Sequence, residues 1–184
     1  MFEQLLGINY TYVDELERAH INYSNEISQS IDIQPNGLLH EKDLNQDIRV
    51  IFEKQGNEWF SFRTSENKDL QFDLFSASFY LVSRYEEYLP YEPDNHNRFP
   101  AKVSCLSEHN LLEEPVVNQW ALHLRDILLA QDSGLLFSPR NFQFISTIDI
   151  DQAWKFKNKG ITRSITGTIR DILHGKWENF LDRW

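Results

Sequence analysis

The chain has few cysteines, no long apolar runs and no basic leader, and each shortage excludes a class of protein. Cys105 is the single cysteine in 184 residues, so the sequence predicts neither a disulfide framework nor a cysteine metal cluster. No window approaches the ~18 consecutive apolar residues that a membrane helix needs. The start, MFEQLLGINYTYVDELE, has no basic leader and no small-residue cleavage site of a signal peptide. We therefore expect a cytoplasmic protein that does not cross a membrane.

Basic residues are outnumbered: 18 Lys and Arg stand against 28 Asp and Glu, for a net charge of -10. Such an acidic chain repels nucleic acid and anionic lipid, so neither is an expected partner. Residues 1–139 hold 10 basic and 23 acidic residues (10 − 23 = -13), whereas residues 140–184 hold 8 and 5 (8 − 5 = +3). This shift predicts an N-terminal domain over residues 1–140 and a second domain that begins at residue 141.

The N-terminal domain begins with short β patterns. Apolar residues alternate with polar ones around Ile8 to Tyr12, Ile21 to Tyr23 and Ile31 to Ile33. The stretch DIRVIFEKQGNEWFSFRT predicts a hairpin in which Gly56 takes a positive φ. We expect residues 5–64 to form one small antiparallel or mixed sheet.

Two helices follow these strands in the sequence. Apolar residues recur at helical spacing from Phe72 to Leu89, with Asp69 or Asp73 as the expected cap and Pro90 as the stop. Residues 91–113 show no period and predict a long loop. A second helix is expected to begin at Pro115, bury a stripe that includes Trp120 and Leu124, and stop at Gly134. The fold class is therefore α+β, with two main helices.

Residues 141–184 predict a buried strand and a helix. NFQFISTIDID is apolar and β-branched, and Ile161, Ile165, Ile169, Ile172 and Leu173 then recur at helical spacing. A strand followed by a helix normally has another parallel strand beside it, so we expect the first β-α unit of a domain cut short at Trp184. The apolar surface left uncovered favours a homodimer.

Asp149 and Asp151 end the predicted strand and share one of its faces, because residues two apart point the same way. Two carboxylates this close repel each other unless a cation or hydrogen-bond donors compensate. A divalent metal would offer that compensation and leave one acid free as a base. Alternatively, Asp151 is only the N-cap of the next helix and Asp149 a loop acid.

FISTIDIDQAWKFKNKG resembles the start of the catalytic domain in bacterial polysaccharide deacetylases, which are metal-dependent carbohydrate esterases. FDLFSASFYLVSRYEEYLP and EEPVVNQWALHLRDIL resemble the region ahead of such domains in Bacteroidetes-type proteins. The resemblance implies a (β/α) barrel that is truncated in this chain and that, when complete, hydrolyses the acetyl amide of an N-acetylated polysaccharide substrate. It also implies Asp149 as the catalytic base and Asp151 as a ligand of Zn²⁺ or a similar divalent metal.

The family's paired histidine ligands, spaced as His-x-x-x-His, have no counterpart here. No two of the six histidines are four residues apart. We therefore expect the natural protein to continue past Trp184 and this chain to be an inactive fragment that binds little or no metal. The alternative is a non-catalytic module, residues 1–140, that binds a glycan or a protein.

Other polar residues have weaker claims to function. Glu86 and Glu87 are adjacent, so on a helix they diverge by ~100° and do not converge on one bond. Tyr85 and Tyr88 suit either a sugar-binding surface or a helix end with Tyr85 buried and its charged neighbours solvated. We expect Cys105 to be inert. We expect the loop residues His96, Arg98 and His109 and the lysines Lys155, Lys157 and Lys159 to be solvated. The aromatic residues Trp59, Phe60 and Phe62 are expected to form the core of the hairpin.

Overall fold

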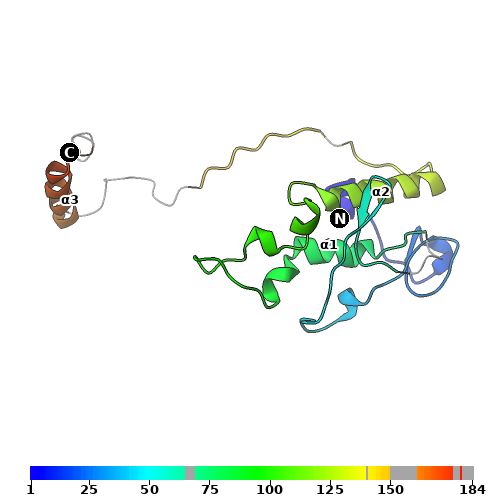
Figure 1. Cartoon of the computed structure of the whole chain (residues 1–184). Coiled ribbons are helices and arrows are strands. Elements are labelled where there is room, and N and C mark those ends of the chain that lie inside the picture. The colour runs from blue at the N-terminus through cyan, green and yellow to red at the C-terminus, as the bar shows by residue number, and fades with distance from the viewer. Residues whose placement is uncertain (65–68, 140, 150–160, 176–178, 180–184) are drawn as a thin grey trace. The chain divides into compact units, whose positions relative to one another are not determined.

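The computed structural model describes residues 1–64, 69–139, 141–149, 161–175 and 179. The chain divides into two compact units, Met1–Arg140 and Asn141–Trp184 (Figure 1). The first unit combines small β-sheets with helices, which confirms the predicted α+β class.

The first sheet pairs β1 (Ile21–Tyr23) with β2 (Ile31–Ile33), and the strands are parallel, with Ile21 opposite Ile31. Parallel neighbours usually need a connection of about a dozen residues or more. Here the connection is residues 24–30, and side chains stabilise it. The buried Asp32 accepts hydrogen bonds from Asn22 Nδ2 at 2.7 Å and from Ser28 Oγ at 2.8 Å. This polar cluster holds the short connection closed.

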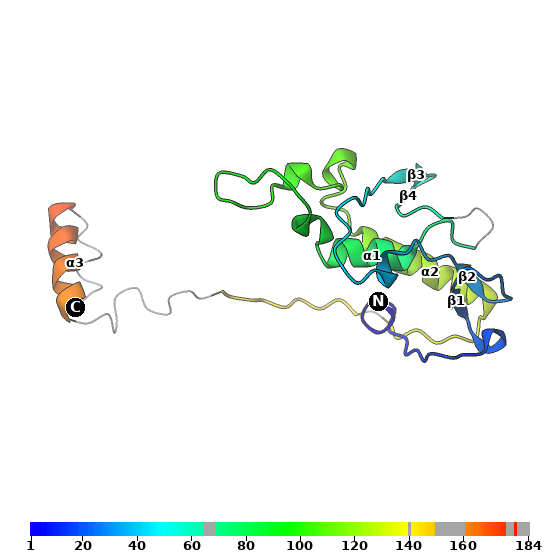
Figure 2. The ribbon, with the colours of Figure 1, turned by 90° about the horizontal axis from the view of Figure 1, so that it is seen from below.

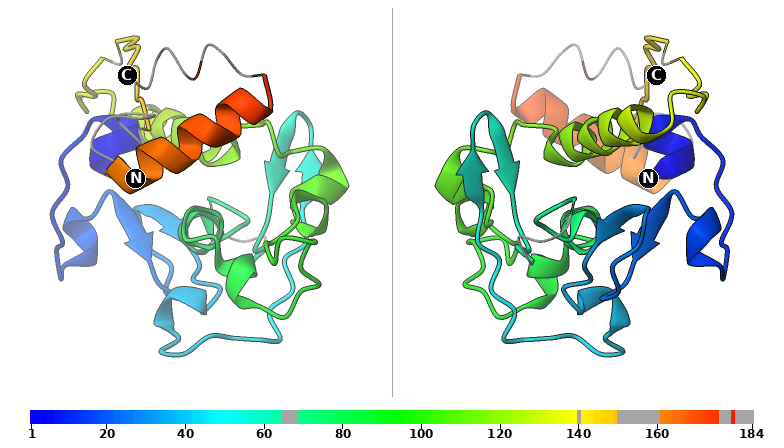
Figure 3. Two further views of the ribbon diagram at one scale, coloured as in Figure 1. Left: turned by 90° about the vertical axis from the view of Figure 1, so that its left-hand side faces the viewer. Right: turned by 90° about the vertical axis from the view of Figure 1, so that its right-hand side faces the viewer.

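The second sheet is the predicted hairpin, formed by β3 (Glu53–Gln55) and the antiparallel β4 (Glu58–Phe60). Gly56 lies in its turn with φ at 61°, as its sequence context predicts. The two sheets lie apart from each other in the first unit (Figures 2 and 3). Residues 5–64 therefore hold two separate two-stranded sheets instead of a single one.

The start of the chain contradicts the predicted strand over Ile8 to Tyr12. A π-helix at Phe2–Leu6 ends at Gly7, which has a φ of 65°, and no strand follows before β1. The alternating tyrosines Tyr10 and Tyr12 contact each other, with ring centroids 5.6 Å apart, and are largely exposed. The carbonyl of Gly7 accepts a hydrogen bond from Ser138 N at 3.0 Å, so the two ends of this unit lie side by side.

Helix α1 (Leu74–Val82) begins at its predicted cap, Asp73, whose carboxylate accepts hydrogen bonds from the backbone N–H groups of Phe75 and Ser76. The helix stops earlier than predicted because Arg84 takes a left-handed conformation, with φ at 55°. A 3-10 helix, Tyr85–Tyr88, then carries the chain to Pro90. Further 3-10 helices lie at Leu16–Arg18, Leu38–His40, Ala101–Val103 and Ser107–His109.

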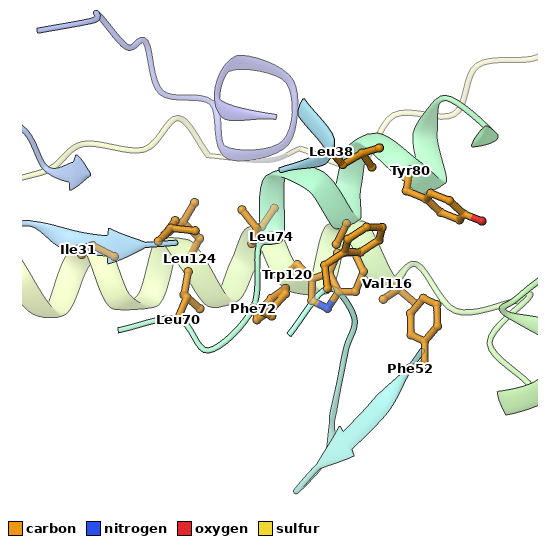
Figure 4. Close-up of a cluster of buried hydrophobic side chains, with 14 of the residues drawn as sticks. Ile31, Leu38, Phe52, Leu70, Phe72, Leu74, Tyr80, Val116, Trp120 and Leu124 are labelled. Carbon is orange, nitrogen blue, oxygen red and sulfur yellow. The ribbon is translucent and has the colours of Figure 1, made fainter. Parts of the chain in front are cut away.

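Helix α2 (Val116–Gln131) begins after Pro115 and packs against α1 (Figure 1). Its buried stripe contains Trp120 and Leu124, as predicted. Figure 4 shows these side chains meeting residues from β2, from α1 and from the segment that holds Leu70 and Phe72. Trp120 Nε1 also donates a hydrogen bond to the carbonyl of Trp59 at 2.6 Å, which ties α2 to the hairpin.

The described residues of the second unit comprise α3 (Ile161–Leu173), residue 179 and residues 141–149. The predicted helix is present, but the strand predicted over residues 142–151 is not formed in residues 141–149, and Phe142 and Ile148 are 92% and 79% exposed. A strand needs a neighbour for its backbone hydrogen bonds, and within the described residues none pairs with this segment. Among the described helices, none has the length and apolar character needed to span a bilayer.

Candidate functional site

The acidic pair from the sequence falls at the edge of what the structure describes. Asp149 is exposed and lies outside regular secondary structure, with Thr147 exposed two residues before it. Asp151 lies outside the described residues, as do Lys155, Lys157 and Lys159. Their predicted roles as base, metal ligand and basic patch therefore stay predictions.

A divalent metal needs several ligands gathered at one point. Within the described ranges, no three His, Cys, Asp or Glu side chains come together in this way. Asp149 thus has no ready-made set of co-ligands in the described part of the chain, and the described residues do not by themselves fit a metal centre.

Glu86 has a structural role that its sequence context did not predict. Its carboxylate accepts hydrogen bonds from Ser104 Oγ at 2.6 Å and from Cys105 N at 2.9 Å. The expectation that the charges beside Tyr85 are solvated is therefore wrong for Glu86, which binds residues 104–105 to the 3-10 helix Tyr85–Tyr88. Glu87 instead forms an ion pair with Arg84.

Tyr85 is buried, as one of the two alternatives predicts, and its hydroxyl accepts a hydrogen bond from Asn45 N at 2.7 Å. A buried ring cannot stack on a sugar, so Tyr85 is excluded from a sugar-binding surface. Tyr88 is 70% exposed.

The loop residues have local structural contacts. Arg98 forms an ion pair with Asp94 at 2.9 Å, and the pKa of Asp94 is lowered by its hydrogen bonds with the backbone and side chain of Arg98 and with the backbone of His96. His109 packs against Trp59, with ring centroids 4.9 Å apart. Burial and the nearby Glu86 carboxylate raise the pKa of Cys105 to about 12, which agrees with an inert thiol.

A pocket of about 520 Å³ lies beside the hairpin. One wall is the hairpin, mainly the face on which Glu53 stands opposite Phe60 and Gln55 opposite Glu58 in the register, with Lys54 at its border. The other walls come from the segments around Ser61 and Gln71 and from His123 of α2. This volume is within the usual range of small-ligand sites, roughly 300–1,000 Å³.

The charged groups around this pocket are largely paired. Arg63 Nη1 lies 2.6 Å from Glu53 Oε2, and His123 Nδ1 lies 3.2 Å from the carboxylate of Glu58. Asp69 accepts a hydrogen bond from Asp32 N at 2.8 Å. Lys54 lies over the Trp59 ring, 5.5 Å from its centroid. The pocket therefore presents many donors and acceptors without a dominant charge.

This pocket is not among the sites that the sequence predicts. The alternation of Glu53, Gln55, Glu58 and Phe60 across a two-residue turn does indicate that these residues share a face. Nothing in the sequence, however, indicates that His123, 65 residues from Glu58, closes the other side.

Comparison with known proteins gives a family match for the first unit. Residues 1–133 match the model of a family described as a family of unknown function (DUF7033). No curated protein matches the chain, and no solved structure matches it.

Proposed function

We propose a function for this protein, which belongs to DUF7033 because the match to that family covers most of the chain. In this proposal the protein is part of a metal-dependent hydrolase that removes acetyl groups from an N-acetylated polysaccharide. The observation that carries the proposal is the sequence TIDID at residues 147–151, which resembles the first catalytic motif of polysaccharide deacetylases. The family match ends at residue 133, so the proposal for residues 141–184 rests on this motif alone.

In this proposal Asp149 is the general base that accepts a proton from the attacking water, and Asp151 is a ligand of a divalent metal such as Zn²⁺. The exposed position of Asp149 is compatible with access of water and substrate. The described residues do not complete a ligand set, so the proposal requires ligands other than these.

The test is acetate release by the complete gene product from N-acetylglucosamine oligomers in the presence of zinc. We expect release that a chelator abolishes, and we expect Asp149→Asn to lower the rate at least about 100-fold, the usual contribution of a general base. Asp151→Asn should lower the bound zinc, measured by elemental analysis, whereas the exposed Asp14→Asn should change neither quantity.

Either of two activity results would overturn the proposal: no acetate release with any first-row divalent metal, or full activity in the Asp149→Asn variant. The 184-residue chain is a second sample, and we expect it to be inactive because it has no two histidines four residues apart. If the complete gene encodes no such histidine pair, the catalytic proposal also fails.

The second candidate is a binding module formed by the first unit. The specific observation that favours it is the polar pocket beside the hairpin, which lies within residues 51–123 and so inside the family match. The two candidates are compatible, because a binding module and a catalytic domain often work in one chain. We also propose a reducing compartment, the cytoplasm, on the strength of the single free cysteine.

A further inference from the structure

The lining of the pocket beside hairpin β3–β4 includes a serine whose buried hydroxyl lacks a partner among the described residues. Ser61 lines the pocket, is 2% exposed, and its Oγ has no hydrogen-bond partner among the described residues. An unpaired buried hydroxyl costs roughly 1–3 kcal/mol, so native proteins seldom keep one without a reason. A ligand that enters the pocket and shifts its lining enough to bond to Ser61 Oγ would remove this cost.

The groups around Ser61 restrict the chemistry of such a ligand. Carboxylates, a guanidinium, an imidazole and amide side chains line one space, and the acids pair with Arg63, with His123 and with a backbone N–H. A strongly charged ligand would have to break one of these pairs or draw Lys54 away from the Trp59 ring. A neutral ligand with many hydroxyl or amide groups finds both donors and acceptors, because each hydroxyl can donate and accept.

Phe60 supplies an apolar wall among these polar groups. Its ring lines the pocket, is half-buried and packs against Phe72, with the two centroids 5.0 Å apart. Phe72 is itself 2% exposed, so it holds Phe60 from behind. An aromatic face beside a ring of hydrogen-bonding groups matches a sugar, which has C–H groups on its ring face and hydroxyls at its rim.

We infer that this pocket binds a neutral saccharide, with Ser61, Gln71 and His123 contacting the hydroxyl or amide groups and Phe60 contacting the ring face. The choice of an N-acetylated sugar as the natural ligand rests on the proposed deacetylase function. The existence of the saccharide site does not, because it follows from the pocket residues. The first unit then holds the polysaccharide on which the catalytic residues act.

The decisive variant is Ser61→Ala in the 184-residue chain. Binding of N-acetylglucosamine tetramer and of glucose tetramer is measured by titration calorimetry, and melting temperature by circular dichroism. We expect Ser61→Ala to weaken saccharide binding about tenfold, the effect of one lost hydrogen bond to a buried group. We also expect its melting temperature to stay the same or rise, because the variant removes an unpaired buried hydroxyl. A structural serine would instead lower the melting temperature.

The matched control is Ser78→Ala. Ser78 lies on α1, away from the pocket lining, and its Oγ is likewise buried without a hydrogen-bond partner among the described residues. This variant should leave binding unchanged. Gln71→Ala should weaken binding, whereas Gln119→Ala, at an exposed position of α2, should not.

The inference is overturned if neither tetramer binds saturably, or if Ser61→Ala and Gln71→Ala bind as the unchanged chain does. Binding of either tetramer with the expected loss in these variants supports it. Preference for the N-acetylated tetramer further supports the choice of natural ligand, and a preference for glucose overturns that choice alone. Acetate release by the complete gene product is measured separately, so the binding site and the catalytic proposal fail or stand independently.

Discussion

Asp73 is fully buried, and its carboxylate accepts five hydrogen bonds. Two come from the backbone at the start of α1, one from Ser76 Oγ at 2.6 Å, one from the Tyr23 hydroxyl at 2.8 Å and one from Asn36 N at 2.7 Å. The positive end of the α1 dipole adds to this stabilisation. One side chain thus joins β1, the turn after β2 and the first turn of α1.

We expect Asp73→Asn to lower the free energy of unfolding by about 2–4 kcal/mol, because an amide offers one acceptor oxygen and turns an N–H₂ group toward donors. Urea unfolding followed by circular dichroism measures the change. The exposed Asp14→Asn should stay within about 0.5 kcal/mol of the unchanged chain. Equal stabilities of the two variants would show that the hydrogen-bond cluster has little energetic weight.

Cys105 gives a prediction about pH. Burial, followed by the nearby Glu86 carboxylate, raises its pKa to about 12, from about 8.5 in an unfolded chain. At about pH 8.5 we therefore expect iodoacetamide to react about 1,000-fold more slowly with the folded chain than with the chain in guanidinium chloride. Mass spectrometry of the alkylated thiol gives both rates. Equal rates would contradict the burial of this thiol.

The raised pKa of Cys105 also makes the free energy of unfolding depend on pH. The folded state favours the neutral thiol, so this stabilising contribution is complete below about pH 8.5 and is lost as the pH rises toward about 12. Burial also raises the pKa of Tyr23 and of Tyr80, which adds to the loss at alkaline pH. The free energy of unfolding should therefore fall steadily over this alkaline range.

At the scale of elements, Gly7 and Gly56 have similar backbone angles but different surroundings. Their φ angles are 65° and 61°, so a side chain at either position costs about 1 kcal/mol of backbone strain. A Cβ at Gly7 would also lie 2.9 Å from Ser138 Cβ, whereas one at Gly56 would meet no atom within 4 Å. We expect Gly7→Ala to destabilise the chain more than Gly56→Ala, by about 1–3 kcal/mol in urea unfolding. Equal losses would mean that the 7–138 contact is loose.

The elements that sequence analysis predicted well are those with strong local patterns. The Asp73 cap, the α2 stripe around Trp120 and the Gly56 turn all follow from neighbours in the sequence. The left-handed Arg84 that ends α1 early has no such local cause in its residue type, since positive φ is uncommon outside glycine. The parallel pairing of β1 with β2 depends on Asp32 and its partners, which only the fold brings together.

The candidate sites show the same division. The acids Asp149 and Asp151 follow from their spacing, and their roles as base and metal ligand stay predictions. The hairpin wall of the pocket could have been deduced from strand register. The unpartnered Ser61 and the closure by His123 could not, because burial and long-range contact are properties of the packed chain.

At the scale of the whole molecule, the buried apolar residues that the structure describes run from Leu6 to Leu128 and all lie in the first unit. We therefore expect a chain that ends at residue 139 to fold by itself. Its two-dimensional ¹H–¹⁵N NMR spectrum should overlay that of the 184-residue chain for residues 1–130. Its melting temperature should lie within a few degrees, because ~0.5 kcal/mol corresponds to only about 1–2 °C in a domain of this size.

Loss of the dispersed signals in this shorter chain would show that the first unit depends on residues 140–184. A control that ends at residue 127 removes Leu128, Phe137 and the hydrogen bond from Ser138 to Gly7, and it should unfold.

The hydrogen bond between Ser138 N and the carbonyl of Gly7 has a topological consequence. A unit whose two chain ends lie side by side can be inserted into a surface loop of another protein with little distortion of that protein. It can equally be joined to another domain in tandem. For the same reason, a short glycine-rich bridge between the two ends would allow new termini to be opened elsewhere, for example in the hairpin turn at Gly56.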